Sequence, residues 1–193
     1  MKYLKILGVA ALCVAMATPS FAEGTDQGED RNAAIAAALM ELARRQAEDE
    51  RIDTNLETFR ALDLEIFSHQ EWDRIHESHT DDVVVYMPDG RVIKGLDAHI
   101  DDMKWFFVWA PDTYIERHIV RFGQGEWSGA VGVLKGTFTE PMPMADGTTI
   151  EPTGNAYEIT FTTIAHWTDE GKMDEEYLFW DNAFFFKQLG LGG

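Results

Sequence analysis

Side chains that could transfer protons gather in the last part of the chain. His166 and Glu175 lie in two strand-like segments on either side of the turn sequence Asp169-Glu170-Gly171-Lys172. A tight hairpin at this turn would place His166 opposite Glu175 and Ile164 opposite Tyr177. An imidazole beside a carboxylate is a common arrangement for general acid–base catalysis. The hairpin therefore predicts a local acid–base pair.

Asp181, at the end of the last predicted strand, is our first choice for a general base. Apolar neighbours raise the pKa of a carboxyl group toward working pH, and Phe179, Trp180 and the three phenylalanines at 184–186 could supply such a setting. The alternative is that Asp181 caps the helix that follows. The hairpin places His166 on the order of 16 Å along the strand from Asp181. These two residues therefore cannot form a contacting dyad in this register.

Strand alternation divides the predicted sheet into two faces. The polar face carries Glu116, His118, Ser128, Ala130, Thr160, Thr162, His166, Glu175, Tyr177 and Asp181. The apolar face carries Ile115, Ile119, Trp127, Val131, Val133, Phe161, Leu178 and Trp180. Either the polar face lines a pocket, or the apolar face packs on helices and the polar face meets water or another subunit; a slip of one residue would exchange the faces. The predicted substrate-binding residues are His118, Tyr177, Glu175, Trp180 and Trp127.

Two metal sites are conceivable from the residue types. A shared face would bring together the two-histidine, one-carboxylate set of His118, His166 and Glu175. His76 and His79 are spaced three residues apart near Glu77, Asp81 and Asp82, where a solvated helix end is the alternative. His69 and His99 have no partner in the pattern. We expect neither a metal nor a cofactor, because the chain also lacks a phosphate-binding loop and an HExxH motif.

The first 22 residues have the layout of a secretory signal peptide. Two lysines precede the apolar run 6–17, and small residues, Ser20 and Ala22, stand where signal peptidases cleave. The alternative is an uncleaved membrane anchor. Cleavage after residue 22 predicts a periplasmic or secreted protein and removes Cys13, the only cysteine, so that no disulfide can stabilise the mature chain.

Composition excludes several classes of function. The chain has 193 residues, of which 45% are hydrophobic, enough for one ordinary core. It has 16 Lys and Arg against 34 Asp and Glu, a formal net charge of −18. Nucleic-acid binding needs a basic surface. We therefore expect a single acidic domain that does not bind nucleic acid and does not insert stably into a membrane after signal cleavage.

The order of predicted elements indicates an α+β domain. Three helical segments come first, at about 31–52, 55–68 and 71–79, followed by a hairpin around Pro88-Asp89-Gly90 and a helix at 97–109. The rest consists of strands and one short helix: Tyr114–Phe122, Glu126–Thr139, Ala156–Trp167, Met173–Asp181 and Asn182–Leu189. Helices followed by antiparallel strands are typical of helices on one side of a bent sheet.

A series of short sequence motifs within this order resembles the SnoaL-like polyketide cyclases of the nuclear-transport-factor-2-like superfamily. The motifs are Phe67-Ser68-His69-Gln70-Glu71-Trp72-Asp73, Asp81-Asp82-Val83-Val84, Gly95, Ala110-Pro111-Asp112, Gly136-Thr137, Pro152-Thr153-Gly154, Gly171-Lys172-Met173, Glu175-Glu176-Tyr177, Asp181 and Gln188-Leu189-Gly190. The resemblance covers residues 54–190 and leaves the polar leader and alanine-rich helix of 23–53 outside. It implies a cone-shaped α+β barrel, whose curved, mainly antiparallel sheet wraps around helices and encloses a pocket.

The resemblance also implies a range of functions. Its cyclases close rings by aldol condensation, using an aspartate base helped by a histidine without metal or cofactor, while other members only bind ligands. We expect an exported, cofactor-free enzyme of the lyase or isomerase type that abstracts a proton next to a carbonyl of a small apolar or aromatic ligand. Asp181 would be the base, and His166, Tyr177 or His118 would polarise the carbonyl. The alternatives are a non-catalytic binding module and a dimerisation scaffold of the same fold. We also expect the protein to form a homodimer.

Overall fold

The computed structural model describes residues 25–144 and 146–192. By its internal contacts the chain divides into two units, residues 1–43 and residues 44–193. Of the first unit, the described residues form the beginning of a helix. The predicted signal peptide lies outside the described residues. Within the described part, no helix combines the length and apolar character needed to cross a bilayer.

One helix, α1 (Thr25–Ala61), replaces the two helices expected before residue 68. The expected break at residues 53–54 does not occur, because neither residue is glycine or proline and Thr54 donates its hydroxyl to the Glu50 carbonyl one turn earlier (2.9 Å). The π-helix η1 (Leu62–Phe67) follows α1 directly. Wide turns of this kind are rare and frequently occur at functional sites.

Three shorter helices complete the helical part. They are the 3₁₀-helix η2 (Trp72–Glu77), α2 (Leu96–Trp109) and α3 (Asn182–Gln188). Gly95 stands at the N-cap of α2 with φ of 89°, a conformation that favours glycine, while Asp97 lies in the first turn. The expected helix starts were therefore close to those observed.

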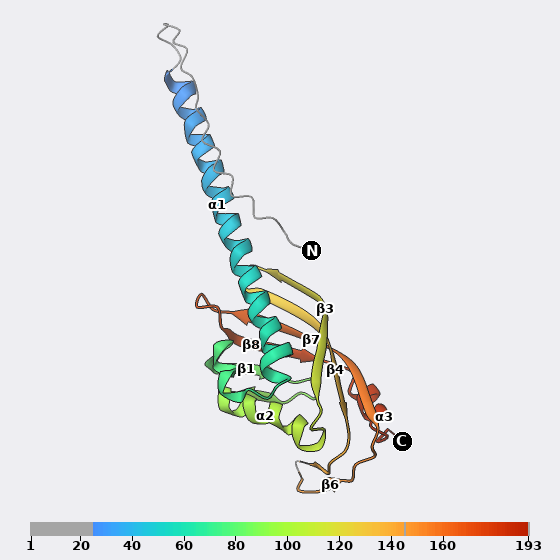
Figure 1. The fold of residues 1–193 in the computed structure, drawn as a ribbon. Coiled ribbons are helices and arrows are strands. Elements are labelled where there is room, and N and C mark those ends of the chain that lie inside the picture. Colours follow the sequence, from blue (N-terminus) through green and yellow to red (C-terminus); the bar gives the residue numbers. More distant parts are fainter. Residues whose placement is uncertain (1–24, 145, 193) are drawn as a thin grey trace. The chain divides into compact units, whose positions relative to one another are not determined.

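The second unit also contains a curved six-stranded sheet (Figure 1). Its strands, in spatial order, are β2 (Val92–Lys94), β1 (His79–Tyr86), β8 (Met173–Phe179), β7 (Ala156–Trp167), β4 (Trp127–Thr137) and β3 (Tyr114–Gln124). All neighbours pair antiparallel except β1 and β8, which are parallel. The connection from β4 to β7 contains a small hairpin of β5 (Met142–Pro143) and β6 (Thr149–Ile150).

The predicted hairpin register is confirmed between β7 and β8, where His166 pairs with Glu175 and Ile164 with Tyr177. Between β4 and β7, however, Ala130 pairs with Thr163. This pairing is shifted by one residue from the expected faces. The long connection at 140–154 does not fix the register there. Burial of the odd-numbered residues of β7, which include Tyr157, Ile159, Phe161 and Trp167, fixes it instead.

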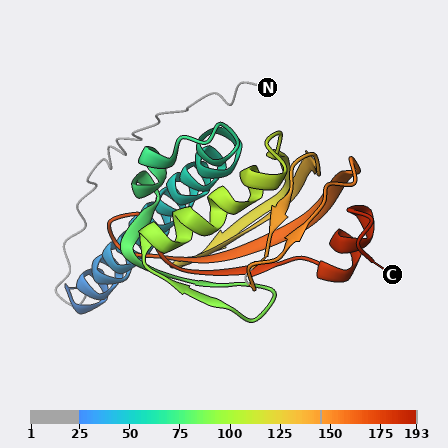
Figure 2. The ribbon, with the colours of Figure 1, turned by 90° about the horizontal axis from the view of Figure 1, so that it is seen from below.

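Helices cover one face of the sheet, and Figure 2 shows α2 (light green) and the end of α1 (teal) over it. Two buried clusters lie between these layers. In one, the fully buried Trp109 packs against the rings of Phe138, Tyr157 and Phe185. The other is centred on side chains of η2, β1, β7 and β8, among them Ile75, Val83, Val85, Trp167 and Met173. These observations confirm the α+β class.

Candidate functional site

A partly enclosed cavity of about 80 Å³ lies between the helices and the covered face of the sheet. Eleven of its lining side chains are apolar: Phe59, Leu62, Phe67, Met87, Met103, Phe106, Ile115, Leu134, Phe161, Leu178 and Trp180. The polar lining consists of Asp63, His99, Asp102, Thr163 and Glu176. A mainly apolar wall with a few polar groups is typical of a small-molecule site.

Asp63 and His118 form a buried acid–base pair at this wall. The π-helix η1 carries Asp63, and β3 carries His118 on the covered face of the sheet. The Asp63 Oδ2 and His118 Nε2 atoms are 2.7 Å apart, and their side chains are 10% and 4% exposed. The ring of Phe59 packs edge-on against the imidazole, with centroids 5.8 Å apart.

Burial raises the pKa of the Asp63 carboxyl above its usual 3.8, although the hydrogen bond from His118 acts in the opposite direction. A carboxylate with a raised pKa binds a proton more strongly than an exposed one. This property suits a general base.

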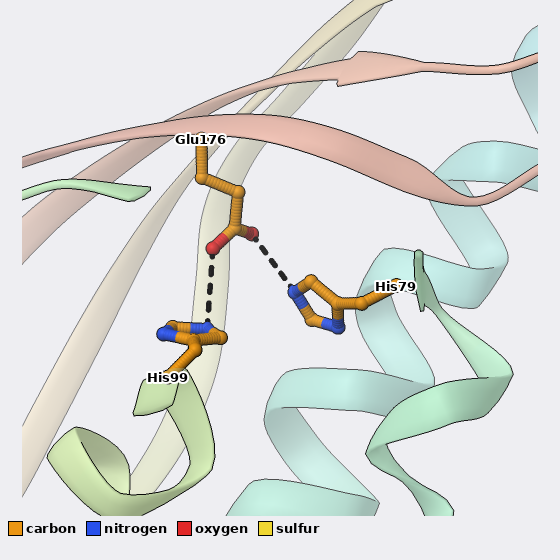
Figure 3. A group of neighbouring side chains, drawn as sticks. All are labelled: His79, His99 and Glu176. Atoms are coloured by element: carbon orange, nitrogen blue, oxygen red, sulfur yellow. Dashed lines mark ion pairs between the residues drawn. The ribbon is translucent and has the colours of Figure 1, made fainter. Parts of the chain in front are cut away.

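A second buried group surrounds Glu176 of β8 (Figure 3). Its Oε1 lies 3.5 Å from Nε2 of His79, which begins β1, and its Oε2 lies 3.4 Å from Nε2 of His99 in α2. Burial lowers the pKa of His99 to about 4, against the raising effect of the Glu176 charge. Burial also acts to raise the pKa of Glu176, but attraction to His79 outweighs it and holds that pKa below its usual value.

The sequence contained a signal for these residues that the face assignment missed. Glu176 alternates with Leu178 and Trp180 on the covered side of β8, and His99 lies on the buried side of α2 with Leu96. A charged or polar residue on an apolar stripe must find a partner, because burying it alone is costly. Asp63 likewise stands next to the buried Leu62 in η1.

Four predicted site residues lie together on the opposite, outer face: Trp127, His166, Glu175 and Tyr177. The Nδ1 of His166 contacts Asp174 Oδ1 at 2.6 Å rather than Glu175. Hydrogen bonding to Asp174 raises the pKa of His166. The predicted His166–Glu175 side-chain pair is therefore wrong, although the two backbones are opposite each other.

Tyr177 and Trp127, on the same outer face, each contact neighbouring side chains. Tyr177 donates its hydroxyl to Glu175 (2.6 Å), which raises the pKa of Tyr177 to about 12. Its ring stacks on Tyr86, and that of Trp127 packs on His166 with centroids 4.9 Å apart. None of the four lines the cavity between sheet and helices. The one-residue shift between β4 and β7 is the reason that Trp127 shares a face with His166.

The remaining predicted residues are divided between cavity and surface. Trp180 lines the cavity, and its Nε1 donates to Asn182 Oδ1 (2.7 Å). His118 reaches the cavity through Asp63. Asp181 is exposed and accepts a hydrogen bond from the Phe184 backbone N–H (2.9 Å). The structure therefore gives Asp181 the helix-capping position that was the alternative, outside the cavity lining.

The two metal sets considered from the sequence do not assemble. His118 lies on the covered face of the sheet, whereas His166 lies on the outer face. His76 contacts the Asp73 carbonyl from an exposed position, while His79 is buried against Glu176. His69 contacts the Glu65 carbonyl at the surface.

The helix-covered curved sheet, with the Asp63–His118 pair at the wall of its cavity, can be compared with known proteins. A family model described as SnoaL-like polyketide cyclase matches residues 58–189. The chain belongs to this family, as the series of sequence motifs predicted. A search of curated protein sequences found no match.

Solved structures confirm the predicted cone fold. A candidate SnoaL-like polyketide cyclase from Jannaschia sp. CCS1 has a TM-score of 0.62 and 16% identity, over 72% of this chain and 92% of that one. IdmH, a candidate polyketide cyclase from Streptomyces antibioticus, has a TM-score of 0.59 and 19% identity, over 70% and 98%. A candidate polyketide cyclase from Xanthomonas campestris has a TM-score of 0.61 and 16% identity, over 72% and 98%. At these identities the likeness concerns the fold.

Proposed function

We propose that this chain is an exported enzyme that abstracts a proton next to the carbonyl of a small apolar substrate. Asp63 is the general base, in place of Asp181, and His118 positions and stabilises it. The observation that carries this proposal is the 2.7 Å Asp63–His118 contact at the wall of an apolar cavity. Membership of a family that includes cyclases supports it, and the signal-like sequence of residues 1–22 supports export.

The proton balance of the step follows from these two side chains. Asp63 Oδ1 takes the proton from the carbon beside the carbonyl, and the electrons of the broken C–H bond pass to the carbonyl oxygen as an enolate. His118 Nε2–H donates to Oδ2 and holds the carboxylate in place. The enolate then either takes the proton back at another carbon, as in an isomerase, or its carbon attacks a second carbonyl, as in an aldol cyclisation. In the second case the oxygen of the attacked carbonyl takes the proton back from Asp63. Thr163 on the cavity wall is a candidate donor to the enolate oxygen.

The cavity favours a small substrate. Its volume of about 80 Å³ is roughly half that of the ~150 Å³ apolar cavity that holds benzene in an engineered protein. Phe106 and Trp180 provide aromatic surface at this wall. We therefore propose ketones smaller than benzene as the substrate class.

Deuterium exchange in D₂O tests the proposal. The protein is incubated with a panel of short ketones, and loss of the α-proton signal is followed by NMR. The rate is expected to be low in acid and to rise as Asp63 ionises, because only the carboxylate accepts a proton. Since burial raises the pKa of Asp63, the rise should occur at higher pH than for an exposed aspartate. Exchange at the buffer rate for every compound would contradict the proposal.

A non-catalytic binding module is the main alternative. Such a protein would bind members of the same panel, which calorimetry would detect, without accelerating their exchange. The comparison of binding with exchange therefore separates the two functions.

We also propose that the outer face of the sheet forms a homodimer. Its strands expose Val120, Phe122, Trp127 and Phe179, each at least 42% exposed. Burying large apolar side chains drives association. Native mass spectrometry is expected to show two chains for the wild type and a larger monomer fraction for Trp127→Glu. A wild type that is monomeric at micromolar concentration would contradict the homodimer.

A further inference from the structure

The buried group around Glu176 has the composition of a metal site. It consists of two imidazoles and one carboxylate, from β1, α2 and β8, and Figure 3 shows both imidazoles directed at the same carboxylate. The side chains of His79, His99 and Glu176 are 1%, 6% and 5% exposed. One possible ligand atom from each lies within 4.8 Å of the others. Two histidines and a carboxylate form a well-known set for divalent transition metals.

The spacing of the atoms agrees with coordination of a common ion. Zinc–ligand bonds of about 2.0–2.1 Å at tetrahedral angles place neighbouring ligand atoms roughly 3.3 Å apart. The two nitrogen–oxygen distances here are 3.5 and 3.4 Å. These distances are long for hydrogen bonds. Each imidazole faces a different oxygen of Glu176, and one atom from each residue lies within 4.8 Å of the others, so one ion would draw the three ligands closer together.

The contacts of His79 favour the tautomer with the proton on Nδ1, whereas the other ring nitrogen, Nε2, faces Glu176. Ser78 donates its hydroxyl proton to the Ile75 carbonyl (3.0 Å). With the Ser78 hydroxyl directed at Ile75, the Nδ1 of His79 faces two acceptors, the Ser78 Oγ at 2.9 Å and the Ile75 oxygen at 3.3 Å, and the tautomer with its proton on Nδ1 satisfies them. In a neutral imidazole the lone pair of Nε2 then points at Glu176, and this nitrogen has no hydrogen-bond partner among the described residues.

This orientation is the one that metal-binding histidines adopt. Such a residue donates its other ring N–H to a carbonyl or a similar acceptor, which fixes both tautomer and ring direction. A cation between the three side chains would bind the Nε2 lone pairs and neutralise the buried carboxylate. His99 and Glu176 also line the cavity, so an ion held by three protein ligands would keep a position open toward it.

We infer that His79, His99 and Glu176 bind one divalent transition-metal ion, with Zn²⁺ as the ion that the spacing fits. This inference departs from the cofactor-free protein expected from the sequence. It uses other residues than the acid–base proposal, so the two can fail separately. Its alternative is an ion pair between a doubly protonated His79 and Glu176.

Calorimetric titration of the metal-stripped mature chain with zinc chloride tests the site, and cobalt chloride provides a spectroscopic probe. We expect one Zn²⁺ per chain and the strong visible bands of four- or five-coordinate Co²⁺. Glu176→Gln and His99→Gln should each weaken zinc binding at least about a hundredfold. The control variant His166→Gln, on the outer face, should bind zinc as the wild type does.

Thermal melts of the metal-stripped variants show whether each one folds, and zinc should raise the melting temperature of the wild type but not of Glu176→Gln. Three results would overturn the inference: no stoichiometric binding by the wild type, equal binding by Glu176→Gln, or the spectrum of six-coordinate hydrated Co²⁺. Each of these would leave the ion pair as the explanation of the cluster.

Discussion

Replacing Asp63 with asparagine is expected to lower kcat/KM for proton exchange by about 10²–10⁴-fold, the usual contribution of a general base. Asparagine has nearly the same shape and can still bond to His118, but its amide does not accept a proton. The loss should therefore appear in kcat and not in ligand affinity. NMR exchange rates and calorimetric affinities for the same ketone separate the two quantities.

Asp181→Asn is the matched control, because this carboxylate caps α3 outside the cavity. It should keep the exchange activity, since asparagine is also a good N-cap. Loss of activity in Asp181→Asn with full activity in Asp63→Asn would reverse our assignment and restore Asp181 as the base.

The same Asp63 variant should also show how much the buried, ionised Asp63 lowers the free energy of unfolding. Because the folded-state pKa of Asp63 lies above the unfolded value near 3.8, its contribution to stability is fully present below that value and is lost as pH rises through the folded pKa. At neutral pH, Asp63→Asn should therefore be as stable as the wild type or more so. If Asp63→Asn is as stable as expected, its loss of activity does not result from unfolding.

Replacing Phe59 with alanine is expected to reduce the free energy of unfolding by about 3–5 kcal/mol. The side chain is 1% exposed and packs edge-on against both His118 and Trp167. Its removal leaves a void beside the acid–base pair that the rigid sheet cannot close. Urea denaturation followed by circular dichroism measures the change.

Phe184→Ala provides the comparison, because this phenylalanine in α3 is 52% exposed and should change stability by no more than about 0.5 kcal/mol. A loss of less than about 1 kcal/mol in Phe59→Ala would show that the layer between α1 and the sheet can repack.

Much of the fold was accessible from the sequence because its signals are local. Turn residues such as Pro88-Asp89-Gly90 and the short link at 169–172 fix neighbouring strands, so β7 was predicted with its observed bounds and its pairing with β8 was correct. The sequence pattern predicted two helices where α1 is continuous, and neither Asp53 nor Thr54 between them prevents helix formation.

The site was much less accessible because it depends on contacts between distant segments. Assignment of residues to faces failed across the long β4–β7 connection, where no short turn fixes the register. His118 was a predicted substrate-binding residue, but its partner Asp63 comes from a helix whose position over the sheet no local pattern specifies. His99 had no partner in the sequence pattern, because the carboxylate that it faces, Glu176, comes from a strand far along the chain.

The parallel pairing of β1 with β8 has a consequence for how the molecule is made. The first and last long strands of the sheet meet side by side, and His79 and Glu176 come into contact only through that junction. Such contacts between distant parts of a chain form slowly, because the loop between them must close first. A nascent polypeptide that still lacks β8 has no complete cavity wall, so a ligand can bind in the cavity only after β8 has been synthesised.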